Sequence, residues 1–129
     1  MRAVQVTRAR RGHGPTLSTL ITSPEKTRIV IAMIDELPSV HPGGVFACPD
    51  IPVNPPVVVL RFRASKSGPV LARASQAVNA TAGPPCQPMS LSVRGHARPS
   101  LAGGVAFLRR VGRLIGKTLV PQRRAASSD

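Results

Sequence analysis

The chain has 129 residues and a formal net charge of +13, with 18 Lys and Arg against 5 Asp and Glu. It contains 14 Pro and 11 Gly but no Trp or Tyr, so a small core has to rest on aliphatic side chains and Met. The length suits one domain, and no stretch is apolar for long enough to span a membrane as a helix.

The charge balance limits the classes of partner. Arg dominates over Lys, and its planar guanidinium matches phosphate and carboxylate groups, which favours nucleic acid, anionic lipid or an acidic cell-surface polymer. GC-rich coding DNA would also enrich Arg over Lys, but it would not remove the acidic residues. The shortage of acids therefore indicates a surface suited to anions.

Residues 1–22 contain no acidic residue, and their cations are all arginines: Arg2, Arg8, Arg10 and Arg11. The apolar residues at 17–21 are too few and too polar for the central part of a secretory signal peptide. We expect this segment to be a disordered basic arm or sequence upstream of the true start codon.

Residues 24–37 are predicted to form a helix. Ser23 can cap it, Pro24 suits the first helical position, and Pro38 forces the chain out of helical geometry. The apolar residues at helical spacing form one stripe: Ile29, Val30, Met33, Ile34 and Leu37.

Residues 57–63 give the clearest strand pattern, because alternate side chains have to point to opposite faces. One face carries Val58, Leu60 and Phe62; the other carries Val57, Val59, Arg61 and Arg63. Turn-forming residues at 65–68 and a return strand over 69–75 predict a hairpin. Residues 89–93 alternate again and predict a third strand that stops near Gly95.

The last predicted element is a helix over residues 100–119, capped by Ser100, with apolar residues at helical spacing. Its C-terminal half is cationic, which complements the negative end of a helix, and it carries Arg109, Arg110, Arg113 and Lys117. We treat these four residues as candidate anion-binding residues.

Together these elements predict an α+β fold with an N-terminal helix, a small antiparallel three-stranded sheet and a C-terminal helix. The domain would cover residues 23–119. Disordered basic ends would precede and follow it, over residues 1–22 and 120–129.

Cys48 and Cys86 are the only cysteines, and they bracket the predicted hairpin. One covalent link between them would indicate an oxidising compartment, whereas two buried thiols would be typical of a cytosolic protein. The residues alone leave both interpretations open.

Several short motifs occur in the same order as these predicted elements. Leu37-Pro38 ends the first helix, and residues 44–50 contain Cys48-Pro49-Asp50. Leu60 to Arg63 lie in the first strand, and Cys86 precedes the last strand. In these features, over residues 23–118, the chain resembles small secreted or lipoprotein-type proteins of actinobacteria. The resemblance implies a Cys48–Cys86 disulfide in an extracytoplasmic domain without a known activity. The chain departs from that pattern in showing no signal peptide or lipobox and no compact strand over 76–85.

No catalytic, cofactor or metal site is predicted. His13, His41 and His96 are scattered without the spacing of metal ligands. Gly116-Lys117-Thr118 looks like the end of a phosphate-binding loop, but Val111 stands where that motif needs Gly. Its late position in a predicted helix favours an exposed cationic helix end instead.

We therefore expect a non-enzymatic secreted or envelope-associated domain of unknown ligand, with an anionic polymer or a membrane surface as partner. One alternative is a cytoplasmic basic protein that binds nucleic acid non-specifically. Its phosphate contacts would come from Arg8, Arg10, Arg11, Arg109, Arg110, Arg113, Arg123 and Arg124. A further alternative is a cationic amphipathic helix that acts at anionic membranes.

Overall fold

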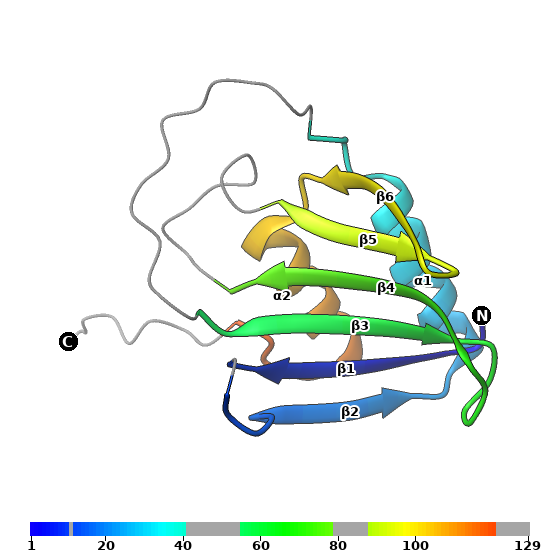
Figure 1. Cartoon of the computed structure of the whole chain (residues 1–129). Helices are drawn as coiled ribbons and strands as arrows, with labels where there is room; N and C mark the ends of the chain where they lie inside the picture. The colour runs from blue at the N-terminus through cyan, green and yellow to red at the C-terminus, as the bar shows by residue number, and fades with distance from the viewer. Residues whose placement is uncertain (11, 41–54, 79–87, 121–129) are drawn as a thin grey trace.

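The computed structural model describes residues 1–10, 12–40, 55–78 and 88–120 (Figure 1). Within these residues, six strands form one antiparallel sheet in the order β2-β1-β3-β4-β5-β6. The strands are β1 (Ala3–Ala9), β2 (Leu17–Ile21), β3 (Val57–Arg63), β4 (Val70–Ala77), β5 (Met89–Val93) and β6 (His96–Leu101). Both helices, α1 (Pro24–Asp35) and α2 (Gly104–Ile115), lie against the same face of the sheet (Figure 1).

The predicted three-stranded sheet is wrong, and the first reason is the N-terminal segment. Instead of a disordered arm, it supplies β1 and β2, and β1 also pairs with β3 along its whole length. Val4 and Val6 are fully buried, whereas Gln5 between them and Thr7 after them are not. Such alternation is what a strand with one buried face requires. The described arginines of this segment, Arg2, Arg8 and Arg10, lie at the ends of the strand rather than in an unfolded arm.

The second reason is β6, which lies where the second helix was predicted to begin. It pairs with β5 across a tight turn in which Arg94 and Gly95 both have positive φ, 51° and 79°. Two such residues are what a type I′ hairpin turn requires. Pro99 is tolerated because β6 is an edge strand. Ser100 therefore belongs to β6 and does not cap a helix.

The second helix is also shorter than predicted, since α2 ends at Ile115 instead of residue 119, and Lys117 and Leu119 follow it. The other elements lie close to their predicted places. α1 starts at Pro24, and the Ser23 hydroxyl accepts a hydrogen bond from the Lys26 backbone N–H at 3.2 Å. The helix ends at Asp35, slightly before the predicted Leu37. β3 covers 57–63 and β5 covers 89–93, as the alternation of their side chains indicates.

The core lies between the helices and one face of the sheet. It contains Val4, Val6, Val30, Ile34, Val58, Leu60, Phe62, Ala74, Met89, Phe107, Leu108, Val111 and Leu119, among others. Because side chains alternate along a strand, the residues between these core residues point to the other face of the sheet. On β3 they include Arg61 and Arg63. Among the described elements, both helices thus cover one face of the sheet and none covers the other (Figure 1).

A buried glutamine determines where α2 begins. The N-cap residue, Gly103, offers no side-chain cap, and the Gly104 N–H donates instead to Oε1 of Gln76 at 2.9 Å. Gln76 lies on β4 and is only 2% exposed. One side chain of the sheet thereby satisfies a helix N-terminus that would otherwise be buried without a partner.

Candidate anion-binding site

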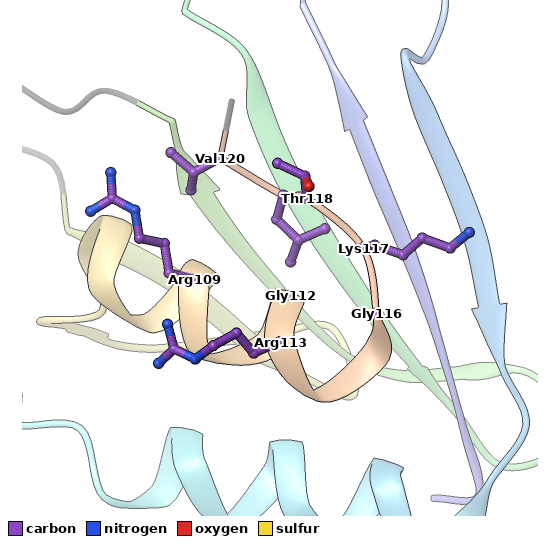
Figure 2. Close-up of a pocket in the computed structure, with 8 residues that line it drawn as sticks. Arg109, Gly112, Arg113, Gly116, Lys117, Thr118 and Val120 are labelled. Atoms are coloured by element: carbon purple, nitrogen blue, oxygen red, sulfur yellow. The ribbon is translucent and has the colours of Figure 1, made fainter. Parts of the chain in front are cut away.

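The C-terminal half of α2 and the segment after it enclose a hollow of about 420 Å³, which we call the α2 groove. It is lined by Arg109, Gly112, Arg113, Gly116, Lys117, Thr118, Leu119 and Val120. Figure 2 shows Arg109 and Arg113 extending from α2 to one side and Lys117 extending from the following segment to the other. The cations therefore stand around a groove whose helical wall includes two glycines.

Two glycines make the groove possible. Gly116 has a φ of 73° and ends α2 in the left-handed conformation, which turns the chain back along the helix. A Cβ at Gly112 would lie 2.5 Å from the carbonyl oxygen of Lys117, a separation that real Cβ atoms do not show. The Lys117 N–H also donates to the Gly112 carbonyl at 3.0 Å. Only glycine at position 112 allows this close return.

The outer wall of the groove is fixed by the N-terminal strand. Nη1 of Arg8 donates to the carbonyl oxygens of Thr118 at 2.7 Å and Leu119 at 3.0 Å. The Arg8 Nε donates to the hydroxyl of Thr16 at 3.1 Å. Leu119 is itself buried in the core. The groove therefore depends on β1, the strand that was predicted to be a disordered arm.

A second hollow of about 380 Å³ lies beside the groove, at the end of the β1–β2 hairpin. It is lined by Arg8, Arg10, His13, Thr16 and Pro56. Arg8 lines this hollow and also contacts the backbone of Thr118 and Leu119, so the two hollows adjoin. The cationic surface thus continues from α2 to the N-terminal hairpin.

The structure brings together three of the four predicted anion-binding residues: Arg109, Arg113 and Lys117 line the groove. Arg110 is exposed on α2 but does not line it. Arg11, Arg123 and Arg124 lie outside the described residues, and so do Cys48 and Cys86. The Cys48–Cys86 disulfide therefore stays a prediction.

The groove cations have no acidic partner in the part of the chain that the structure describes. Its acidic residues are Glu25, Asp35 and Glu36, all on α1 or at its end. None of the described residues that line either hollow is a carboxylate. Arg109 and Arg113 are one helical turn apart, about 6 Å along the axis, so their charges add at one place. Among the described residues, nothing compensates the positive charge of the groove.

Sequence reasoning missed a second group of cations, which we call the sheet-face cluster: Arg61, Arg63 and Arg73. Arg61 lies directly opposite Arg73 in the β3–β4 pairing, and Arg63 follows two residues along the same face of β3. The alternation of residues 57–63 did place Arg61 and Arg63 on one face. The alternation could not predict that Arg73 lies beside Arg61, because this pairing depends on the register between two strands.

The described residues do not favour a metal site, a phosphate-binding loop or a membrane-spanning helix. They hold no group of three His, Cys, Asp or Glu side chains placed to bind a metal ion. Gly116-Lys117-Thr118 ends a helix, whereas a phosphate-binding loop opens one. Neither described helix has the length and apolar character needed to cross a membrane.

Known proteins add no further information on the site. No family model, no curated protein and no solved structure matches the chain. The resemblance to small actinobacterial secreted proteins therefore stays a prediction.

Proposed function

We propose that the protein is a non-enzymatic nucleic-acid-binding protein, which contacts the phosphate backbone through the α2 groove without reading base sequence. The observation that supports this most strongly is the set of three groove cations with no carboxylate beside them among the described residues. Phosphate contacts by Lys and Arg supply most of the affinity in such binding. The adjoining hollow, with Arg8 and Arg10, extends the same surface.

The packing of α2 disfavours a membrane surface as the partner. A helix that lies in a membrane interface needs its apolar side free to enter the lipid. The apolar side of α2 is already buried in the core, with Phe107, Leu108 and Val111 at 0–2% exposure. What α2 leaves exposed is its cationic side. A polyanion in solution therefore fits α2 better than a bilayer.

The aromatic residues favour backbone contacts over base contacts. Proteins that grip single strands through their bases place exposed aromatic rings among the basic residues. Phe62 and Phe107 are both buried in the core, and Phe46 lies outside the described residues. The described surface thus offers charge but no stacking platform, which fits binding that is independent of sequence.

The test measures the affinity for a fluorescently labelled DNA duplex at several salt concentrations. Each phosphate contact contributes about 0.9 to the slope of log affinity against log salt. The triple variant R109Q/R113Q/K117Q should therefore reduce that slope by about 2.7. The control triple K26Q/R28Q/R98Q removes the same number of Arg and Lys residues from exposed positions outside the groove. It should leave the slope nearly unchanged.

Two outcomes would contradict the proposal. Equal losses in both triple variants would mean that net charge alone, and not the groove, attracts DNA. Tighter groove-dependent binding of a sulfated polysaccharide than of the duplex, at the same salt concentration, would make an acidic polymer the partner instead.

A further inference from the structure

A second anion site is suggested on the sheet face that faces away from the helices. Its residues are the sheet-face cluster of Arg61, Arg63 and Arg73 defined above. The neighbouring residues of β3, Leu60 and Phe62, point into the core, so the three guanidinium groups belong to the other side. The cluster and the α2 groove therefore lie on opposite sides of the sheet.

Two of the three arginines are held in place by neutral acceptors. Nη1 of Arg61 donates to the hydroxyl of Thr7 at 3.1 Å. Nη2 of Arg63 donates to Oε1 of Gln5 at 2.9 Å, and its Nη1 donates to the Gly68 carbonyl at 3.0 Å. These bonds orient the guanidinium groups without neutralising them. Each guanidinium has five N–H donors, so further donors are left for a ligand.

The arrangement is electrostatically unfavourable by itself. Like charges placed directly opposite each other on a sheet destabilise it, and Arg61 and Arg73 are such a pair. Burial, followed by the charges of Arg73 and Arg63, lowers the pKa of Arg61, yet a guanidinium stays protonated under ordinary conditions. The acidic residues of the described chain lie on α1 or at its end, on the helix side. Nothing described on this face offsets the cluster.

We propose that the sheet-face cluster binds a phosphomonoester dianion. Arg61 and Arg63 supply oriented donors, and the exposed Arg73 completes the site from the neighbouring strand. A dianion would neutralise most of the mutual repulsion, and Arg is the side chain whose fork matches phosphate oxygens. This site is independent of the nucleic-acid proposal, because it shares no residue with the α2 groove.

The test measures binding of inorganic phosphate by calorimetry at constant ionic strength. R73Q removes one exposed charge and should weaken binding about tenfold, the loss expected for one charge-assisted hydrogen bond. R61K keeps the charge but loses the fork, and it should weaken binding by a similar factor. R28Q removes an exposed arginine from α1, on the other side of the sheet, and should bind phosphate like the wild type.

A second arm identifies the source of the phosphate group. In the R109Q/R113Q/K117Q background, a short single-stranded oligonucleotide is compared with and without a 5′-phosphate. A preference for the phosphorylated strand that R73Q removes would assign the site to a terminal phosphate, and R73Q-sensitive binding of free phosphate would assign it to the free ion. The proposal is overturned if R73Q changes neither measurement, or if R28Q weakens phosphate binding as much as R73Q.

Discussion

The two cationic surfaces are built in different ways. In the α2 groove, a close backbone return at Gly112 makes a hollow, and long exposed side chains stand around it. In the sheet-face cluster, strand register brings arginines together on an open sheet, and neutral acceptors orient two of them. The groove is suited to attracting an extended polyanion, whereas the cluster is suited to holding one phosphate group.

The difference also shows what each surface costs in stability. Of the groove cations, Arg113 lies in the last turn of α2 and Lys117 just after it, where the helix dipole favours positive charge. The cluster has no such compensation, and Arg61 faces a like charge directly across the strands. Removing a charge should therefore have opposite effects on stability at the two places.

The largest expected change in stability comes from reduction of a Cys48–Cys86 disulfide, and it does not distinguish between the two surfaces. The resemblance to small actinobacterial secreted proteins implies a Cys48–Cys86 disulfide. If it is present, its reduction should lower the free energy of unfolding by about 3–4 kcal/mol, because a cross-link restricts the unfolded chain. Non-reducing intact mass and denaturant unfolding with and without reductant measure this. Both cysteines lie outside the described residues, from which the groove and the cluster are defined. Free thiols in material from the native host would contradict the disulfide and would place the protein in a reducing compartment.

The next effect separates the surfaces. Gly112→Ala should gain about 1 kcal/mol of helix propensity but lose more to the clash with the Lys117 carbonyl, for a net loss of about 1–2 kcal/mol. Duplex binding should weaken with it, while phosphate binding at the cluster should not. Thermal unfolding and the two binding assays check this. Gly14→Ala is the control, since nothing lies within 4 Å of a Cβ there. Unchanged stability in Gly112→Ala would contradict the described close return.

The smallest effect has the opposite sign. Arg73→Gln should raise the free energy of unfolding by about 0.2–1 kcal/mol in the absence of ligand, because it relieves the repulsion with Arg61. The gain should shrink as salt is added, since added ions screen exposed charges. Denaturant unfolding at low and high salt measures both. A loss of stability at low salt would show that Arg73 has a structural role instead.

The parts of the fold that could be predicted from the sequence have local causes. Ser23 and Pro24 mark the start of α1, and the alternation of Val58, Leu60 and Phe62 identifies β3. β1 was missed because its short Val4 and Val6 alternation sits among arginines that suggested a disordered arm. It becomes a strand because β2 and β3 pair with it on its two sides.

The edge strand β6 also could not be predicted from local sequence. β6 has few apolar residues and a proline, and as an edge strand it needs neither a proline-free sequence nor two buried faces. Ser100 then suggested a helix cap, whereas the actual partner of the helix N-terminus is Gln76. Gln76 lies 28 residues earlier in the chain, so no local pattern could indicate that pairing.

Some residues of the candidate sites could likewise be predicted from local sequence, and others could not. Arg109 and Arg113 could be predicted to lie together, because helical spacing alone places them near one another. Lys117 was predicted on the same helix, but it follows the end of α2 and reaches the groove through the turn at Gly116. The Arg8 contact with Thr118 spans 110 residues, and the Arg61–Arg73 pair depends on strand register. Neither follows from residue spacing. The long-range contacts that assemble these cations into sites therefore could not be predicted from the sequence pattern.

The most direct test of the account is a map of backbone amide chemical shifts during titration with a short DNA duplex. We predict changes at Arg109, Gly112, Lys117 and Thr118, continuing to Thr16 of the hairpin, with little change at Arg61 and Arg73. Changes concentrated on β3 and β4, with none along α2, would contradict the assignment of the α2 groove as the nucleic-acid surface.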